Sequence, residues 1–265
     1  MISCSDERVQ QKVAQAGHLW LFLDYDGTLS DFAATPDEIN PDEELIALIE
    51  LLAGLPDSRI TIISGRRLAH IQALLPVSGI LKAGTYGLEL QTTDGQTIHQ
   101  VDYGTVRPLL DDLKQEWEQL LDGRNGFYLE DKGWTIAIHG KDAIEEEATA
   151  VLRVANRQAQ GLLEQERGHI FRLLGGHRFL ECGPKSANKK RTVEYLLSTF
   201  PWHDDALLVY LGDDDKDEVA FEEIQQRGGI AIAVGERLRN SSADCWLPSP
   251  QAVRLWLQGV IKARV

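Results

Sequence analysis

Short apolar runs alternate with amphipathic stretches over the first part of the chain. Residues 19–23 are apolar at every position, and residues 59–63 are mostly apolar. Runs of this length, bounded by turn residues, are typical of strands buried on both faces of a parallel sheet. Between them, residues 42–52 carry apolar side chains at the three- and four-residue spacing of a helix. The pattern predicts alternating strands and helices over residues 19–23, 42–52, 59–63, 68–75 and 80–84.

The middle of the chain follows a different pattern. Asp94 and Gly95 form a hairpin-turn signal between two strand-like runs, and two further pairs of such runs each enclose a short glycine-containing turn. Antiparallel pairs combined with long helices indicate an α+β region. The expected elements are helices over 104–121 and 142–166 and strands over 86–91, 97–103, 127–131, 134–139, 169–174 and 178–181.

The alternation of helices and strands resumes after this region. The expected elements are helices over 189–200, 216–227 and 250–261 and strands over 206–211 and 229–234. The first and last parts of the chain therefore predict an α/β domain with a Rossmann-like parallel sheet. We assign residues 1–103 and 184–265 to this discontinuous domain and residues 104–183 to an inserted α+β domain.

The composition restricts the class of protein. Lys and Arg number 27 and Asp and Glu number 41, which leaves a formal charge of −14 over 265 residues. An acidic surface argues against nucleic acid as a partner, because backbone phosphates are bound by clustered Lys and Arg. No apolar run approaches the roughly 20 residues that span a bilayer, and the N-terminus lacks the pattern of a signal peptide. We expect a cytoplasmic monomer without membrane contact.

The cysteines support this expectation. Cys4, Cys182 and Cys245 are odd in number and far apart in the chain. They show neither a disulfide framework nor the spacing of a zinc site. We therefore expect reduced thiols, as in most cytoplasmic proteins.

Polar side chains follow three of the predicted parallel strands. The carboxyl ends of such strands lie along one edge of the sheet, where α/β proteins bind their ligands. Two aspartates one residue apart repel each other unless a cation or a shared proton offsets their charge. We therefore expect a divalent cation and a phosphate or another anion at this edge. The polar residues are Asp24 and Asp26 after the first strand, Ser64 and Arg66 after the second, and Asp213, Asp214 and Asp217 after the strand over 206–211.

These residue types can carry out phosphoryl transfer. Carboxylates from two strands can hold Mg²⁺, which keeps coordination positions for water and a substrate phosphate. A free carboxylate can attack phosphorus and form an aspartyl phosphate. Ser64, together with Lys189 at the start of the helix over 189–200, can bind the remaining phosphoryl oxygens and stabilise their charge.

Four motifs in order along the chain resemble those of the haloacid-dehalogenase (HAD) superfamily of phosphatases. They are DYDGT at 24–28, ISGR at 63–66, NK at 188–189 and GDDDKDE at 212–218. The inserted domain resembles the C2-type cap of that superfamily. Two longer segments are similar to the trehalose-6-phosphate phosphatase family, namely YLEDKGWTIAIH at 128–139 and FLECGPKSANK at 179–189.

The resemblance implies a role for each residue at the sheet edge. Asp24 would be the nucleophile, and Asp26 would protonate the leaving sugar oxygen and later activate water. Ser64 would hold the phosphoryl group, and Lys189 would neutralise both that group and Asp24. The implied Mg²⁺ ligands are Asp24, the backbone carbonyl of Asp26 and Asp213, with Asp214 and Asp217 close by as second ligands or through water and Lys189.

In the inserted domain, the resemblance implies that Lys132, His139 and Glu181 hydrogen-bond the sugar, with Glu130 and Arg66 as supporting residues. The implied reaction is the Mg²⁺-dependent hydrolysis of trehalose 6-phosphate, a step of trehalose biosynthesis, with this small-molecule sugar phosphate as the binding partner. One alternative is the same chemistry on a glucosylglycerate, mannosylglycerate or sucrose phosphate. A phosphorylatable receiver domain is an alternative of another class, because its strand ends also gather Asp, Ser or Thr, and Lys. A receiver, however, has neither a D-x-D-G-T motif nor so large an insertion.

Overall fold

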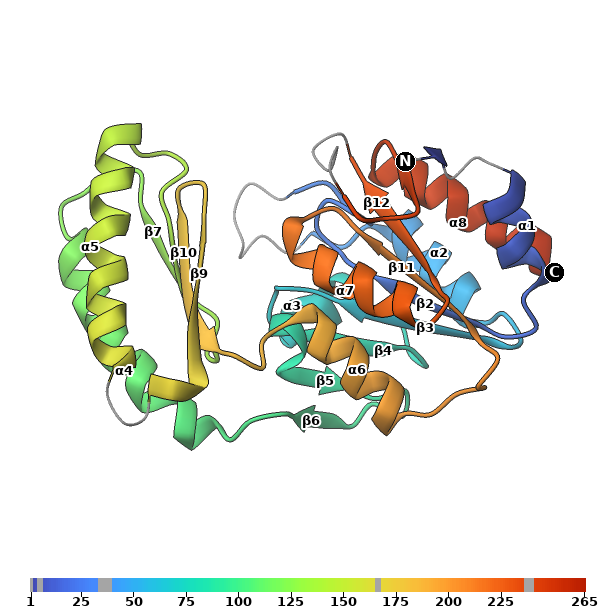
Figure 1. Cartoon of the computed structure of the whole chain (residues 1–265), viewed down its shortest axis with the longest axis horizontal. Helices are drawn as coiled ribbons and strands as arrows, with labels where there is room; N and C mark the ends of the chain where they lie inside the picture. The colour runs from blue at the N-terminus through green and yellow to red at the C-terminus, as the bar shows by residue number, and fades with distance from the viewer. Residues whose placement is uncertain (1, 4–6, 33–39, 165–167, 236–240) are drawn as a thin grey trace. The chain divides into compact units, whose positions relative to one another are not determined.

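A computed structural model describes residues 2–3, 7–32, 40–164, 168–235 and 241–265 (Figure 1). The chain divides into two compact units. The first unit comprises residues 1–98 and 188–265, and the second comprises residues 99–187. The second unit is therefore an insertion between two segments that fold together.

Nine strands of the described chain form the sheet of the first unit, in the order β1-β13-β12-β11-β2-β3-β4-β5-β6. Neighbouring strands from β1 to β4 are parallel, and β5 pairs antiparallel with β4. β2 lies between β11 and β3, and its residue Leu21 is paired with Val209 on one side and Ile60 on the other. The strands are β1 (Ile2–Ser3), β2 (Leu19–Leu23), β3 (Ser58–Ile63), β4 (Leu81–Gly84), β5 (Glu89–Gln91), β6 (Thr97–His99), β11 (Leu207–Gly212), β12 (Ile230–Val234) and β13 (Cys245–Leu247).

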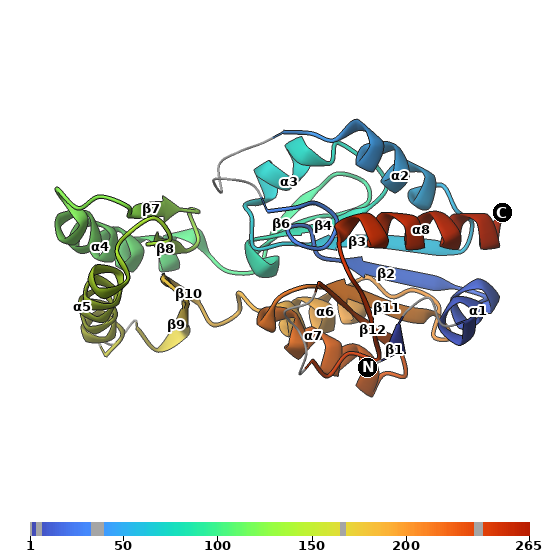
Figure 2. The same ribbon diagram turned by 90° about the horizontal axis from the view of Figure 1, so that it is seen from above.

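β2 is buried on both faces because its side chains alternate between two cores. Leu19, Leu21 and Leu23 belong to the core that includes α1, α2, α3 and α8, whereas Trp20 and Phe22 pack with α6 and α7. Figure 2 shows α2, α3 and α8 on one side of the sheet and α6 and α7 on the other. The predicted α/β fold with a mostly parallel sheet is therefore confirmed. The helices are α1 (Glu7–Gln15), α2 (Glu43–Ala53), α3 (Leu68–Leu74), α6 (Lys189–Thr199), α7 (Asp215–Gln226) and α8 (Pro250–Arg264).

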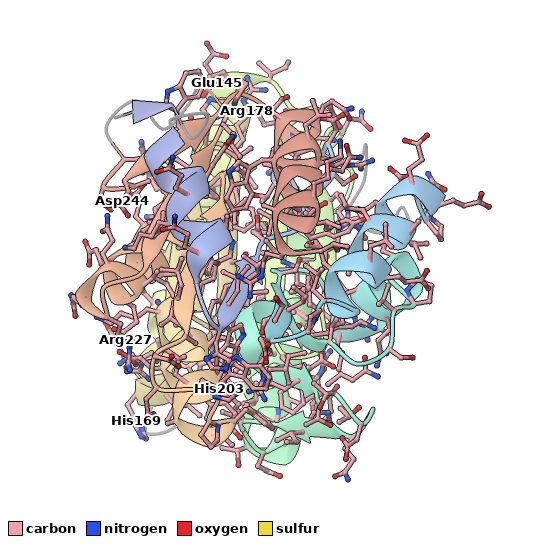
Figure 3. All side chains as sticks on the ribbon, turned by 90° about the vertical axis from the view of Figure 1, so that its right-hand side faces the viewer. Glu145, His169, Arg178, His203, Arg227 and Asp244 are labelled. Atoms are coloured by element: carbon pink, nitrogen blue, oxygen red, sulfur yellow. The ribbon has the colours of Figure 1, made fainter. Side chains whose placement is uncertain are left out.

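The second unit contains, within the described residues, a four-stranded antiparallel sheet in the order β7-β8-β10-β9. Two helices cover one face of this sheet, and Trp117 of α4 and Ala155 of α5 pack there with Ile138 of β8. Between β9 and β10, the guanidinium of Arg178 pairs with Glu145 at the start of α5 (Figure 3). The elements are α4 (Tyr103–Leu121), β7 (Tyr128–Asp131), β8 (Ile136–His139), α5 (Glu145–Leu163), β9 (Phe171–Gly176) and β10 (Phe179–Pro184).

The inserted unit extends a few residues beyond the bounds expected from the sequence pattern. His99 and Tyr103 were both expected to lie in a strand of the α/β domain over 97–103, but their rings pack against Trp134 of the second unit. At the other end, Arg172 donates a hydrogen bond to the carbonyl of Ala187. These contacts attach the flanking segments to the second unit.

Three elements have no counterpart among the expected ones, namely α1, β1 and β13. The two strands have only two and three residues, which is too short to show a periodic pattern. They are strands because β13 pairs with both β12 and β1. Among the described helices, none combines the length and the apolar character needed to cross a membrane.

The expectation of reduced cysteines is wrong for Cys245, and Cys4 lies outside the described residues. Cys245, at the start of β13, is disulfide-bonded. Cys182 is a free thiol and lies in the core of the second unit. Burial raises the pKa of the Cys182 thiol to about 12, so this thiol is unreactive at neutral pH.

Candidate active site

Four segments of the first unit bring the predicted catalytic residues to the same edge of the sheet. Asp24 directly follows β2, Ser64 directly follows β3, and Asp213 directly follows β11. Lys189 is the first residue of α6, which is capped by the side chain of Asn188. Asp24, Ser64 and Lys189 are all buried. The parallel order of the strands thus places these groups close together, as the motif positions predicted.

The ammonium of Lys189 lies between two carboxylates. Its Nζ is 3.0 Å from Oδ1 of Asp24 and 2.5 Å from Oδ1 of Asp217. The hydroxyl of Tyr210 also donates to Oδ1 of Asp217, at 2.7 Å, and the backbone N–H of Asp214 donates to Oδ2 at 3.1 Å. Both oxygens of Asp217 are therefore engaged in holding Lys189 and the start of α7 in place.

Asp213 lies beside the loop that follows β2. The hydroxyl of Thr28 is 3.4 Å from Oδ1 of Asp213 and 3.5 Å from Oδ2 of Asp24. Gly27 has a φ of +77°, and a Cβ atom there would lie 2.2 Å from Oδ2 of Asp213. Only glycine accepts both this backbone conformation and this close approach. The D-x-D-G-T sequence therefore allows Asp213 to lie directly against the loop that carries Asp24.

The guanidinium of Arg66 forms a bidentate pair with Asp26. Its Nε donates to Oδ2 at 2.7 Å, and its Nη2 donates to Oδ1 at 2.7 Å. The backbone N–H of Arg66 donates to Oγ of Ser64 at 3.1 Å. We expected Arg66 to support sugar binding; in the structure its side chain holds Asp26, and its backbone orients Ser64.

Asp214 lies apart from the other acidic groups at this edge. It caps α7 by accepting a hydrogen bond from the backbone N–H of Lys216, and its side chain is 44% exposed. Among the described residues, side-chain oxygens of Asp24, Asp213 and Asp217 lie within 4.8 Å of one another. Asp214 is outside this group, which we call the acidic cluster.

Burial and mutual repulsion raise the pKa of two members of the acidic cluster. Burial is the main reason that the pKa of Asp24 lies well above its ordinary value, although the charge of Lys189 opposes this shift. Burial and the charge of Asp217 raise the pKa of Asp213 to about 6. Burial also acts to lower the pKa of Lys189, but the charges of Asp217 and Asp24 outweigh it and the pKa is raised.

The second unit has its own group of ionisable side chains, Glu130, Lys132, His139 and Glu181, which we call the cap cluster. Nζ of Lys132 is 2.8 Å from Oε2 of Glu181 and 3.6 Å from Oε2 of Glu130. Nε2 of His139 is 2.8 Å from the same oxygen of Glu130. Both glutamates are paired with Ala137 of β8, from opposite sides. The small side chain of Ala137 leaves room for these longer groups on the sheet face opposite to the helices.

Three members of the cap cluster are buried, and its two carboxylates face one ammonium and the ring of His139. Glu130, Lys132 and Glu181 are between 2% and 6% exposed. Burial acts to raise the pKa of Glu130, but the hydrogen bond with His139 and the charge of Lys132 hold this pKa below its usual range. The structure therefore brings together all four residues that the sequence assigned to sugar binding in this unit.

The comparison with protein families decides the family of the chain. A family model described as trehalose-phosphatase matches residues 22–248. The chain belongs to the trehalose-phosphatase family. This family is part of the HAD superfamily, so the resemblance that the four motifs indicated is confirmed.

Individual relatives agree with this assignment. The trehalose-phosphate phosphatase of Mycobacterium tuberculosis (strain ATCC 25618 / H37Rv) is 34% identical over 217 residues, which cover 78% of this chain and 52% of that protein. Trehalose-phosphate phosphatase B of Arabidopsis thaliana is 24% identical over 261 residues, covering 94% of this chain and 68% of the plant protein. The chain thus spans about half the length of the mycobacterial relatives it matches. The C-terminal domain of Candida albicans trehalose-6-phosphate phosphatase has the same fold, with a TM-score of 0.81 at 18% identity over 99% of both chains.

Phosphatases of the trehalose-phosphatase family are generally metal-dependent, and the acidic cluster fits such an ion. Asp24, Asp213 and Asp217 offer only oxygen atoms, the donor type that Mg²⁺ requires. Together with Lys189, the three carboxylates leave a formal excess of two negative charges. A divalent cation would balance this charge and reverse the rise in the pKa of Asp24 and Asp213.

Sequence reasoning missed three residues at this edge of the trehalose-phosphatase fold. Thr28 could have been found, because it completes the D-x-D-G-T motif. Nothing in the pattern indicated Tyr210, because it lies inside β11 and reaches Asp217 only in the folded chain. Tyr86 was assigned to a strand, but it has a φ of +53° in a short 3₁₀ turn, and its hydroxyl accepts a hydrogen bond from Nζ of Lys216 at 3.2 Å.

Proposed function

We propose that the chain hydrolyses trehalose 6-phosphate to trehalose and phosphate, with Mg²⁺ as the metal ion and Asp24 as the nucleophile. The observation that carries this proposal is the buried ammonium of Lys189 between Asp24 and Asp217. A carboxylate and a phosphate repel each other, and a buried cation next to Asp24 offsets that repulsion most strongly where water is excluded. Membership of the trehalose-phosphatase family supports the choice of substrate.

In the first step, a carboxylate oxygen of Asp24 forms a bond to phosphorus, and the bond between phosphorus and the sugar oxygen breaks. Asp26 gives its proton to that sugar oxygen, so trehalose leaves as an alcohol. Ser64 and Lys189 donate hydrogen bonds to the phosphoryl oxygens and stabilise the charge that develops on them.

In the second step, water attacks the phosphorus of the aspartyl phosphate, and Asp26 accepts a proton from that water. The bond between phosphorus and Asp24 breaks, which releases phosphate and regenerates the carboxylate. These two roles require Arg66 to release Asp26 at least in part, because both oxygens of Asp26 accept hydrogen bonds from the guanidinium.

Bound Mg²⁺ would stabilise negative charge on the phosphate during the transfer. Asp24 and Asp213 would hold it, with the backbone carbonyl of Asp26. Asp217 would act mainly by positioning Lys189, since both of its oxygens already accept hydrogen bonds. Asp214 would contribute through water at most, because its side chain caps α7.

We also propose that the second unit is a C2-type cap and that its cap cluster selects the sugar. Sugar hydroxyls both donate and accept hydrogen bonds. The carboxylates of Glu130 and Glu181 can accept from them, and the ammonium of Lys132 can donate to them. His139 would orient Glu130 through the contact at 2.8 Å.

The test is phosphate release from a panel of sugar phosphates in the presence of Mg²⁺. The panel holds trehalose 6-phosphate, sucrose phosphate, glucosylglycerate and mannosylglycerate phosphates, and glucose 6-phosphate. We expect kcat/KM for trehalose 6-phosphate to exceed the other values by at least about 100-fold, equivalent to about 2.7 kcal/mol of selective binding in the transition state. A higher value for another sugar phosphate would reject the substrate but keep the chemistry. Absence of turnover on the whole panel would reject both.

A further inference from the structure

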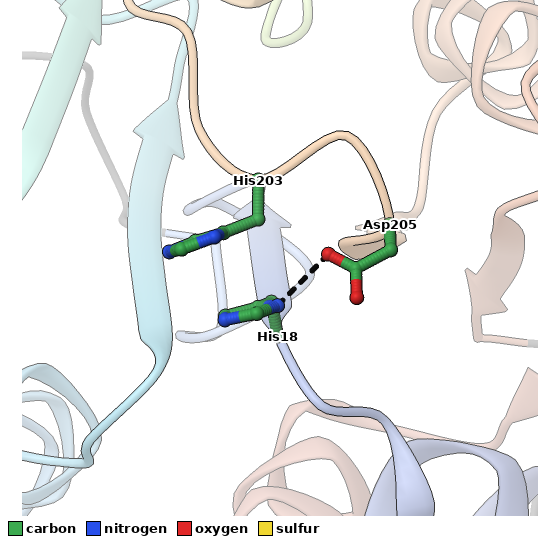
Figure 4. Close-up of side chains that lie close together, drawn as sticks. All are labelled: His18, His203 and Asp205. Carbon is green, nitrogen blue, oxygen red and sulfur yellow. Dashed lines mark hydrogen bonds and ion pairs between the residues drawn. The ribbon is translucent and has the colours of Figure 1, made fainter.

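A second group of side chains with potential metal-ligand atoms lies at the other edge of the first unit's sheet. It consists of His18, His203 and Asp205 (Figure 4). His18 directly precedes β2, and Asp205 lies two residues before β11. The acidic cluster lies at the opposite ends of these same strands, roughly 15–20 Å away for strands of this length. The two groups are therefore separate.

The three side chains are already close enough to share one ion. The rings of His18 and His203 are stacked, with centroids 3.4 Å apart and an angle of 7° between their planes. Nδ1 of His18 is 2.9 Å from Oδ1 of Asp205. One potential ligand atom from each residue lies within 4.8 Å of the other two. Bonds of about 2.0–2.2 Å in a tetrahedral site place ligand atoms about 3.3 Å apart, and the two rings would have to turn out of their stacked arrangement so that a lone pair of each points at the ion.

The backbone around these residues is held in place by other contacts. The ring of Trp202 packs edge-on against His203 at 4.8 Å, and the guanidinium of Arg59 lies over Trp202 at 4.3 Å. The backbone N–H of Leu207 donates to the carbonyl of His18 at 2.9 Å, which ties the start of β11 to the start of β2. The ligands thus come from two segments whose relative position is fixed by the sheet.

The donor set differs in kind from that of the acidic cluster. Two imidazoles and one carboxylate favour zinc and similar transition metals, whereas Mg²⁺ and Ca²⁺ prefer sites made of oxygen alone. The other ring nitrogen of His18, Nε2, lies 3.9 Å from Oδ1 of Asp57. This separation is longer than a hydrogen bond, so Asp57 would need to move closer to orient His18 as a ligand.

We propose that His18, His203 and Asp205 bind one transition-metal ion of the zinc class, with water in the fourth position. His18 and Asp205 are 187 positions apart in the sequence, so the ion links the two segments that enter the central strands β2 and β11. Binding to the folded chain and not to the unfolded chain stabilises the fold. The ion takes no part in the phosphate chemistry, because it is held at the opposite edge of the sheet.

The test measures Zn²⁺ binding by titration calorimetry on the full chain after chelation, with Mg²⁺ in excess to occupy the acidic cluster. We expect one equivalent of Zn²⁺ to bind, and its affinity to fall by at least about 10-fold in His18→Ala, in His203→Ala and in Asp205→Asn. His177→Ala is the matched control. His177 is 80% exposed and lies 3.8 Å from Glu145, a histidine–carboxylate pair without a second imidazole, so its loss should leave the affinity unchanged.

A second readout identifies the ligands directly. The electron paramagnetic resonance spectrum of the Cu²⁺-loaded chain should show coupling to two imidazole nitrogens, reduced to one in His18→Ala and in His203→Ala. Circular dichroism without metal checks that the variants fold, and Zn²⁺ should raise the melting temperature of the parent chain and of His177→Ala only. Equal Zn²⁺ affinity in the parent and in both His18→Ala and His203→Ala would overturn the proposal, as would a Cu²⁺ spectrum without two-nitrogen coupling.

Discussion

The acidic cluster and the cap cluster both bury charged side chains, but the two clusters differ in net charge. The acidic cluster sets three carboxylates against the one ammonium of Lys189, a formal excess of two negative charges, whereas the cap cluster sets two carboxylates against the ammonium of Lys132, an excess of one, and adds a hydrogen bond with His139. Burial, together with the charge of Asp217, raises the pKa of Asp213, whereas the hydrogen bond with His139 and the charge of Lys132 outweigh burial and lower the pKa of Glu130.

The difference shows what each cluster is suited to bind. An excess of negative charge in a buried place is unfavourable by itself and creates a demand for a cation. The cap cluster has a smaller excess of charge and its carboxylates are already paired with Lys132 and His139, so this demand is weaker there and its hydrogen-bonding atoms can serve neutral hydroxyl groups. The comparison therefore assigns ion and phosphate chemistry to the first unit and sugar recognition to the second, and each part of this assignment can be tested.

Replacing the nucleophile should have the largest effect. In Asp24→Asn, the side chain can no longer attack phosphorus, so kcat should fall by at least about 10³-fold. The variant should fold normally, and its melting temperature should be equal or higher, because a buried carboxyl group with a raised pKa is replaced by a neutral amide. Steady-state kinetics and thermal melting measure both quantities. Substantial residual phosphatase activity would remove Asp24 from the role of nucleophile.

Removing the metal should be nearly as severe but reversible. Exhaustive chelation should reduce turnover by at least about 100-fold, and added Mg²⁺ should restore it, because the acidic cluster otherwise keeps uncompensated charge. Asp213→Asn is the companion variant, and it should require a higher Mg²⁺ concentration for half-maximal activity. Full activity after chelation would contradict the assignment of the acidic cluster as a metal site.

Truncating a side chain of the cap cluster should lower the turnover of a sugar phosphate much more than the turnover of a phosphate ester without a sugar. Glu181→Ala should lower kcat/KM for trehalose 6-phosphate by about 10–100-fold, because it removes a sugar contact and leaves Lys132 less well paired. Turnover of p-nitrophenyl phosphate, which has no sugar, should change less than about threefold. The ratio of the two effects is the measurement. Equal losses on both substrates would mean that Glu181 does not act through the sugar.

The contributions of the two clusters to the free energy of unfolding should also change with pH in opposite directions. The pKa of Asp213 rises from 3.8 to about 6 on folding, so between these values the folded chain holds more protons than the unfolded chain. The contribution of Asp213 to the free energy of unfolding should therefore fall by about 3 kcal/mol as pH rises from about 4 to 6. The pKa of Glu130 is lowered below 4.5. Its contribution is present above pH 4.5 and is lost as pH falls through the lowered value.

Hydrogen exchange of peptides from each unit, in metal-free buffer, can separate these two contributions. Protection of the first unit should decrease between pH 4 and pH 6 after correction for intrinsic exchange, and Asp213→Asn should flatten this trend. Glu130→Gln is the matched variant in the second unit. A common pH trend in both units would show that the charge balance of the clusters does not control their stability.

The sequence patterns predicted the elements of the parallel sheet well but the short peripheral strands poorly. The sequence predicts β2 because five consecutive apolar residues are typical of a strand buried on both faces. β1 and β13 carry no such pattern, since they become strands only by pairing with a neighbour. The 3₁₀ turn at Tyr86 was hidden as well, because an aromatic residue with positive φ is not favoured locally and is held by its surroundings.

At the candidate site, the sequence indicated the chemical groups but not their partners. The positions of Asp24, Ser64 and Asp213 after parallel strands were enough to place them at one edge. The pairing of Arg66 with Asp26 could not be read from the chain, because nothing local favours it over a contact with a substrate. The resemblance linked Asp217 with Lys189, but its other partners, the hydroxyl of Tyr210 and the backbone N–H of Asp214, could not be read from the chain.

The sequence by itself thus indicated the order of elements, the α/β class with an inserted α+β unit, and the candidate reacting groups. These follow from local periodicity and from motif positions relative to strand ends. Only the tertiary structure decided which charged side chains pair with one another and which are buried, because pairing and burial depend on distances between segments far apart in the chain. The same reason explains why the site formed by His18, His203 and Asp205 is invisible in the sequence. Its ligands are close only because β2 and β11 are neighbours in the sheet.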